Sequence, residues 1–269
     1  MSEDEIILTH ILQCRPIDLL PKRSALSFAQ QKQFEAYKRR RQAGEPLQYI
    51  LGTCNFMGLE LAVNPSVLIP RPETEQLVDA ALKYLTLSFP NASIGNLIQI
   101  LDLGTGSGNI AIALAKFVPQ SQIVSVEVSA QVLEAAKINA RQHGVEERIK
   151  FVCSDMFVIL SEAKDRNFNL IISNPPYIPT SQFGSLPRDV QKEPRMALDG
   201  GEDGLNFYRI IIKYTPRLLR SGACLMMEFG DGQAEAVKKL VEAQKVFSSI
   251  EIIQDLAGRD RIIRAVLSS

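Results

Sequence analysis

Residues that build metal and redox sites are scarce in this chain of 269 residues. It has only two histidines, His10 and His143, which lie far apart. This scarcity argues against a histidine metal site and against a Ser-His-Asp hydrolase. The four cysteines are scattered without any CxxC pair, and three of them lie in or beside apolar runs. We therefore expect reduced core thiols and no bound metal.

An excess of charge of one sign and long apolar runs are also missing. Thirty basic and thirty acidic residues give a net charge of zero, which argues against a protein that holds nucleic acid mainly through its phosphates. No stretch approaches the ~18 consecutive apolar residues of a membrane span, and the acidic start lacks the basic residues of a signal peptide. We expect a soluble cytoplasmic monomer without stable nucleic-acid binding or membrane association.

From about residue 95, apolar runs of strand length alternate with helical patterns. This alternation predicts an α/β fold with a doubly wound, mostly parallel sheet. We expect seven strands, the last two pairing antiparallel at one end, over residues 99–103, 122–127, 149–153, 168–173, 223–229, 248–254 and 260–267. The expected domains are a small helical domain (1–52), a linking β-hairpin (53–72) and a catalytic domain (73–269).

A short apolar run ends at Asn174-Pro175-Pro176-Tyr177. Two consecutive prolines cannot donate to a sheet, so the strand must stop here, and their fixed φ leaves the carbonyls of residues 174 and 175 facing a cleft. These acceptors beside an aromatic ring suit a planar NH2 group, either a carboxamide or a base amine, whose two donors must be satisfied when buried. Taken alone, the motif leaves an ordinary strand end as the alternative interpretation.

A glycine-rich loop follows the first strand of the predicted sheet, in the order Asp102-Leu-Gly104-Thr105-Gly106-Ser107-Gly108. Alternate glycines let the backbone turn tightly and approach a ligand closely. Dinucleotide-binding proteins place their third glycine one position later. Asp102, two residues before the first glycine, suits a ligand with an ammonium group in place of a pyrophosphate.

Two further strand ends carry residues that an adenosyl group needs. Glu127 ends the second strand, 19 residues after Gly108, where an acid can accept both hydroxyls of a ribose. After the third strand, Asp155 can accept the adenine amine and Met156 can cover its ring. Each residue alone is weak support, but three strand ends in order indicate S-adenosylmethionine, bound at the carboxyl ends of the strands.

Two segments remain outside these motifs. Ile69-Pro-Arg71-Pro-Glu73-Thr-Glu75 opens a helix, and helix entry explains its acids but not Arg71 between two prolines. We therefore take Arg71 as a candidate for a substrate cleft.

Between Tyr177 and about Asp203 lie about 25 residues rich in Pro, Gly and charge, far more than usually join a strand to a helix. We interpret them as a flap over the cleft.

Together these motifs resemble those of the glutamine methyltransferases of peptide chain release factors, the HemK or PrmC family. The resemblance covers the chain from about residue 25 to its end. It rests on residues 44–52, 69–75, 102–108, 174–177, Glu193-Pro194 and 255–261. Asn-Pro-Pro-Tyr alone is shared with methylases of adenine and of ribosomal RNA, but its combination with the Pro-Arg-Pro-Glu-Thr-Glu block is specific.

The resemblance implies a class I methyltransferase fold and transfer of a methyl group from S-adenosylmethionine to a glutamine side-chain amide. The substrate glutamine would be that of the Gly-Gly-Gln loop of class-1 release factors. Cofactor contacts would fall on residues 104–108, Glu127, Met156 and Asn174. The glutamine would bind at residues 174–177, with Arg71, Glu73 and Glu193 as further substrate-binding candidates.

For catalysis we expect the Asn174 side-chain oxygen and the Pro175 carbonyl each to accept one N–H of the substrate amide, with Tyr177 packed on it. The chain departs from the family in having Glu127 where an Asp is usual, and in a helical arm shorter than usual. The alternatives are methylation of a ribosomal-protein glutamine or of an exocyclic amine of RNA or DNA, and a scaffold that binds S-adenosylmethionine without catalysis.

Overall fold

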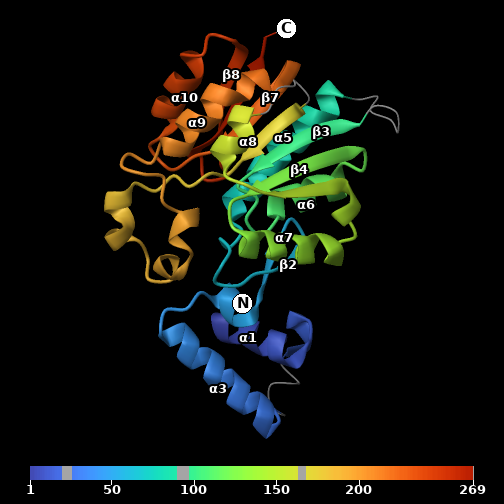
Figure 1. Cartoon of the computed structure of the whole chain (residues 1–269). Coiled ribbons are helices and arrows are strands. Elements are labelled where there is room, and N and C mark those ends of the chain that lie inside the picture. The colour runs from blue at the N-terminus through green and yellow to red at the C-terminus, as the bar shows by residue number, and fades with distance from the viewer. Residues whose placement is uncertain (20–25, 90–96, 163–167, 269) are drawn as a thin grey trace.

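The computed structural model describes residues 1–19, 26–89, 97–162 and 168–268. Its centre is a seven-stranded sheet in the order β5-β4-β3-β6-β7-β9-β8 (Figure 1). All neighbouring strands are parallel except β9, which runs antiparallel to both β7 and β8. The strands are β3 (Ile98–Leu103), β4 (Ser121–Glu127), β5 (Ile149–Cys153), β6 (Phe168–Ser173), β7 (Leu219–Glu228), β8 (Phe247–Gln254) and β9 (Asp260–Leu267). The predicted fold class is confirmed.

Helices cover both faces of this sheet because its central strands are apolar on both sides. Along β3, Ile98 and Ile100 pack into one buried cluster, whereas Leu101 and Leu103 pack into the other. The first face carries α5 (Pro72–Ser88), α6 (Asn109–Phe117) and α7 (Ala130–Gln142). The second carries α8 (Met156–Glu162), α9 (Asn206–Tyr214) and α10 (Ala234–Glu242).

The strand order reverses direction beside β3, and this reversal determines where a ligand can bind. The chain moves outward from β3 through β4 to β5 and then returns to place β6 on the other side of β3. The connections therefore diverge at the carboxyl ends of β3 and β6 and leave a crevice there. The glycine-rich loop follows β3, and Asn174 follows β6.

The residues before α5 form short helices and a hairpin. The helices are α1 (Glu3–Leu12), α3 (Phe28–Gln42) and α4 (Leu47–Leu51), and the hairpin strands are β1 (Thr53–Phe56) and β2 (Leu59–Ala62). Ion pairs join α3 to α1, with Lys38 on Asp4 and Arg41 on Glu3. The hairpin turns at Met57 and Gly58, which both have positive φ, as a type I′ turn requires.

The segment of residues 177–203, which we call the flap, contains the 3₁₀ turns η3 (Thr180–Ser185), η4 (Val190–Lys192) and η5 (Arg195–Ala197). Its two ends meet where Ile178 bridges Asp199. The flap, gold in Figure 1, extends from the sheet toward the N-terminal helices. There Oδ2 of Asp189 lies 3.7 Å from a guanidinium nitrogen of Arg41 in α3. Within the described ranges, no helix is long and apolar enough to cross a membrane.

Candidate active site

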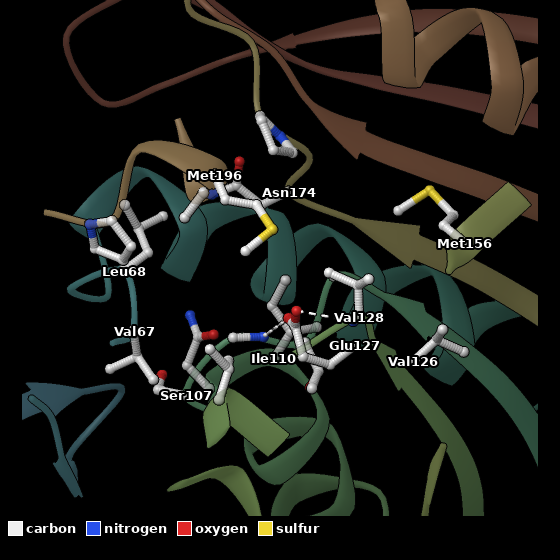
Figure 2. A pocket seen from close by; sticks show the side chains of 18 of the residues that line it. Val67, Leu68, Ser107, Ile110, Val126, Glu127, Val128, Met156, Asn174 and Met196 are labelled. Carbon is white, nitrogen blue, oxygen red and sulfur yellow. Dashed lines mark hydrogen bonds between the residues drawn. The ribbon is translucent and has the colours of Figure 1, made fainter. Parts of the chain in front are cut away.

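A cavity of about 260 Å³ opens at the carboxyl ends of β3, β4, β5 and β6, where ligands of open parallel sheets bind. Figure 2 shows it surrounded by side chains from several elements, among them Asn174, Met196 of the flap, Glu127 and Val128. Its lining includes most of the predicted cofactor residues: Gly104, Thr105, Gly106, Ser107, Glu127, Asp155, Met156 and Asn174.

The glycine loop presents backbone to this cavity. Gly104 and Gly106 have φ of 73° and 56°, a region that side chains other than glycine rarely adopt. A Cβ on Gly106 would meet nothing within 4 Å, so that position borders open space. Gly108 has a different task, because a Cβ there would lie 2.9 Å from Ile112 and 3.2 Å from Ala136. It allows α6 to pack on α7 and is not part of the cavity wall.

The Glu127 carboxylate is held by backbone amides at the edge of the cavity. Oε1 accepts hydrogen bonds from the N–H groups of Val128 (2.9 Å) and Ser129 (3.2 Å). Oε2 accepts from the N–H of Gly106 at 3.2 Å. The end of β4 is thereby joined to the glycine loop. A carboxylate has about four acceptor sites, and these amides use three, so Glu127 retains capacity for about one ribose hydroxyl.

Asp102 lies below this layer and does not line the cavity. Its side chain is fully buried at the end of β3, and its Oδ1 has no hydrogen-bond partner within the described part of the chain. Burial raises the pKa of this carboxyl to about 7, and the hydrogen bond that Oδ2 accepts from Ser125 at 3.3 Å acts in the opposite direction. The Asp102 side chain therefore bonds to Ser125 of β4 and lies outside the cavity in which an ammonium group would bind.

The remaining lining fits an adenosyl ligand in its chemistry. Asp155 accepts the N–H of Phe157 through Oδ1 at 2.7 Å, and its neighbour Met156 contributes an apolar wall. Apolar groups from other elements complete the enclosure: Val67, Leu68, Ile110, Val126, Val128, Val132 and Phe207. A carboxylate for hydroxyl groups, glycine backbone and apolar walls are the features that a nucleoside joined to an amino acid needs.

The Asn174 side chain directs its amide nitrogen at Thr74, which also lines the cavity. Nδ2 donates a hydrogen bond of 2.9 Å to Oγ1 of Thr74, and Thr74 donates one of 2.7 Å to Glu228. Asn174 and Pro176 line the cavity, whereas Pro175 is buried and its ring does not line it.

Tyr177 lies behind this wall, at the base of the flap. Gln233 donates to its carbonyl oxygen at 2.9 Å. Its ring packs so closely on Gly230 that a Cβ there would lie 2.9 Å from the ring. Burial raises the pKa of the Tyr177 hydroxyl to about 12, so this group remains neutral. The ring is outside the cavity lining and stabilises the turn from its far side.

The other predicted substrate residues separate into two groups. Arg71 lines the cavity and forms an ion pair with Glu193 of the flap. Glu193 is buried, and its other oxygen accepts the N–H of Ile69 at 3.1 Å. It therefore holds Arg71 without lining the cavity itself. Glu73, in the first turn of α5, also lies outside the lining.

The structure also places residues at the site that the motifs did not single out. Thr74 lies within the block that opens a helix and Glu228 within the predicted strand of residues 223–229, and neither is assigned a role by the motifs. Both contribute to the hydrogen-bond chain behind Asn174. The pairing of Ser173 with Met227 puts Glu228 level with Asn174. An acid at the end of an apolar strand next to the Asn-Pro-Pro-Tyr strand was the available signal.

Sequence comparison finds two family models and many curated relatives that match this chain. A model of the PrmC N-terminal domain matches residues 2–52, and a model of the methyltransferase small domain matches residues 74–190. The chain is 45% identical to a release factor glutamine methyltransferase of Geobacter sulfurreducens, over 83% of this chain and 74% of that protein. It is 37% identical to the protein of that name from Thermodesulfovibrio yellowstonii, over 98% of this chain and 91% of the other.

Among solved structures, a methyltransferase from Pyrococcus furiosus superposes with a TM-score of 0.58. The two chains share 15% identity, over 87% of this chain and the whole of the other. At this identity the likeness concerns the fold alone.

Proposed function

This chain belongs to the family of release factor glutamine methyltransferases, and from that membership we propose its substrate and the roles of its residues. It transfers the methyl group of S-adenosylmethionine to the side-chain amide nitrogen of a glutamine in a peptide chain release factor. We assign the target to the Gly-Gly-Gln loop of class-1 release factors. Three properties remain predictions: a cytoplasmic location, a monomeric state and the lack of stable nucleic-acid binding.

The observation that supports this proposal best is the orientation of Asn174. Its NH2 group is engaged by Thr74, so its oxygen is the group left for a ligand. Asn174 lies in the wall of the same cavity that Gly106 and Glu127 line. A substrate N–H bonded to Asn174 would therefore lie beside the cofactor, as methyl transfer between them requires.

S-adenosylmethionine supplies an electrophilic methyl group: the amide nitrogen forms the N–CH3 bond, the C–S bond breaks with its electron pair left on sulfur, and an N–H proton passes to water. We propose that the glycine loop and Glu127 hold the amino acid and ribose parts. Asp155 and Met156 are assigned to the adenine ring. Asp102 supports the loop from below, and Gly108 permits its packing.

The task of the protein groups is orientation, because an amide nitrogen is a poor nucleophile whose lone pair is delocalised into the carbonyl. The Asn174 oxygen and the Pro175 backbone carbonyl each accept one N–H of the glutamine, which aims the nitrogen at the methyl group. The same acceptors stabilise the positive charge that the nitrogen gains. Alignment of this kind can supply ~7–11 kcal/mol, so the site needs no dedicated strong base.

The substrate side is assigned to the cavity mouth and the N-terminal domain. Arg71 and Pro176 line the mouth, Glu193 holds Arg71, and Tyr177 supports the turn from behind. Glu73 lies beside them at the start of α5. We propose that residues 1–52 form a domain that docks the release factor and that residues 73–269 form the domain that catalyses methyl transfer. Residues 53–72 link the two domains.

Transfer of labelled methyl groups tests the function. Purified class-1 release factors are incubated with the enzyme and labelled S-adenosylmethionine, with the Gly-Gly-Gln glutamine changed to alanine as the control substrate. We expect label only on the unchanged factor. Labelling of the control factor, or of RNA or ribosomal protein alone, would overturn the assignment.

A further inference from the structure

A buried chain of two hydrogen bonds runs from the cavity wall to the end of β7. Asn174 Nδ2 lies 2.9 Å from Thr74 Oγ1, which lies 2.7 Å from a carboxylate oxygen of Glu228. Thr74 and Glu228 are each only 1% exposed, so bulk water does not compete for these bonds. They come from the first turn of α5 and the last residue of β7.

The single proton of the Thr74 hydroxyl gives this chain a direction. An ionised carboxylate only accepts hydrogen bonds, so Thr74 must donate its proton to Glu228. The Thr74 oxygen is then left to accept a hydrogen bond. In the Asn174 side chain, only the NH2 group can donate one. With the NH2 group bound to Thr74, the carboxamide oxygen of Asn174 faces the substrate.

We propose that Thr74 and Glu228 are positioning residues, which fix the carboxamide of Asn174 with its oxygen toward the substrate amide. The inference rests on the proposed function, since it assigns the acceptor that orients the glutamine. A carboxamide can turn by 180° with little change of shape, so packing alone selects its orientation weakly. The hydrogen-bond chain supplies the missing selection.

Charged and titratable groups surround Glu228 on several sides. Arg261 approaches from β9, Arg71 and Glu73 from the start of α5, and Tyr177 and Tyr208 also interact with it. Burial is the largest effect and raises the pKa of Glu228 to about 7. The Thr74 hydrogen bond and the two arginines act in the opposite direction, whereas Glu73 adds to the rise.

Protonation of Glu228 would reverse the chain. A carboxylic acid can donate to Thr74 Oγ1, which frees the hydroxyl proton of Thr74 for the oxygen of Asn174. The NH2 group of Asn174 would then face the NH2 group of the substrate, and two donors cannot form a hydrogen bond. The wild-type kcat should therefore rise with pH through about 7, the pKa of Glu228.

Three variants test the inference in the labelled-methyl assay. Thr74→Val keeps the shape of the side chain but removes the hydroxyl, and we expect kcat to fall about 10- to 100-fold. The KM for the release factor and the Kd for S-adenosylmethionine should change less than about 3-fold, because the Thr74 hydroxyl is already engaged by Asn174 and Glu228. Thr74→Ser restores the hydroxyl and should recover most of kcat.

Glu228→Gln removes the titrating group. We expect this variant to have a lower kcat than the wild type and a kcat profile without the acid limb.

A second measurement needs no substrate. The ¹³C resonance of the Glu228 carboxyl is followed against pH in the wild-type protein and is assigned by its absence from the Glu228→Gln spectrum. We expect a midpoint near 7. If Glu228→Gln fails to fold, the two Thr74 variants still test the positioning role. The Glu228 resonance is then assigned by site-specific labelling.

Wild-type kcat in Thr74→Val, or a wild-type kcat profile whose acid limb does not follow the titration midpoint of Glu228, would overturn the inference. Failure of the proposed function is a separate outcome, because it would leave the wild-type enzyme itself without activity on release factors. In that case the titration midpoint still reports on the hydrogen-bond chain.

Discussion

Asp102 is the last residue but one of β3, two positions before the first glycine of the loop, and burial controls the pKa of its carboxyl group. The side chain is inaccessible to solvent, and one of its oxygens has no partner among the described residues. Such a carboxyl is more easily protonated, which is why its pKa rises from 3.8 to about 7. Its ionised form therefore weakens the folded state at neutral pH.

The sign of this effect can be tested with Asp102→Asn in the ligand-free protein. A raised folded-state pKa gives stability that is fully present below the unfolded value of 3.8 and is lost as pH rises to about 7. The variant lacks this loss, so we expect its free energy of unfolding to exceed that of the wild type by ~2–4 kcal/mol at pH 8. Urea unfolding at pH 4 and pH 8 measures the change. An equal difference at both pH values would contradict the assignment.

Asn174 carries the catalytic role that we assign to the cavity wall. Asn174→Ala removes the acceptor, so we expect turnover to fall by ~10²-fold or more, while S-adenosylmethionine binding persists at reduced strength. Single-turnover methyl transfer gives the first quantity and calorimetric titration the second. Near-normal kcat would refute the acceptor role, and complete loss of cofactor binding would make Asn174 a binding residue instead.

At the scale of elements, the flap is fastened to the start of α5 by Glu193. This carboxylate is buried, pairs with Arg71 and accepts the N–H of Ile69. Flap and helix entry therefore form one unit at the cavity mouth, although they lie more than a hundred residues apart. Loss of this fastening should loosen the flap without disturbing the sheet.

Glu193→Gln tests that fastening because it keeps the shape and removes the charge. Uncompensated charge near a buried position is costly, so we expect ~1–3 kcal/mol less stability, faster proteolysis within residues 177–203, and a raised KM for the release factor. The matched control is Arg195→Gln in the same flap, which breaks the exposed pair with Asp199 and should have little effect. Equal proteolysis of both variants would contradict the role of Glu193.

The elements and the loops at their ends were predictable because their signals are local. Apolar runs specify the strands, and a parallel sheet brings its carboxyl ends to one edge, so the glycine loop, Glu127, Asp155 and Asn174 meet. The partners of Asn174 were not predictable in this way. Thr74 satisfies the pattern of a helix start, and its contact with Glu228 spans 154 positions, which only the assembled fold brings together.

At the scale of the whole molecule, Asn139 of α7 joins the hairpin linker to the glycine loop. Its Oδ1 accepts the N–H of Ala62 at 2.7 Å, and its Nδ2 donates to the carbonyls of Ala62 (3.0 Å) and Ser107 (2.9 Å). The side chain is fully buried. One residue thus sets the position of the linker and of the cofactor loop together.

Asn139→Ala should therefore weaken both the fold and the cofactor site. It leaves buried backbone groups of Ala62 and Ser107 without partners, each of which costs ~1–3 kcal/mol, and it frees the loop that lines the cavity. We expect a lower free energy of unfolding and a higher Kd for S-adenosylmethionine, measured by urea unfolding and calorimetry. The control is His143→Ala, which removes an exposed contact with the Glu60 carbonyl between the same two elements and should change neither quantity. If Asn139→Ala loses stability but binds the cofactor as the wild type does, the linker and the loop are independent, and the coupling through α7 is wrong.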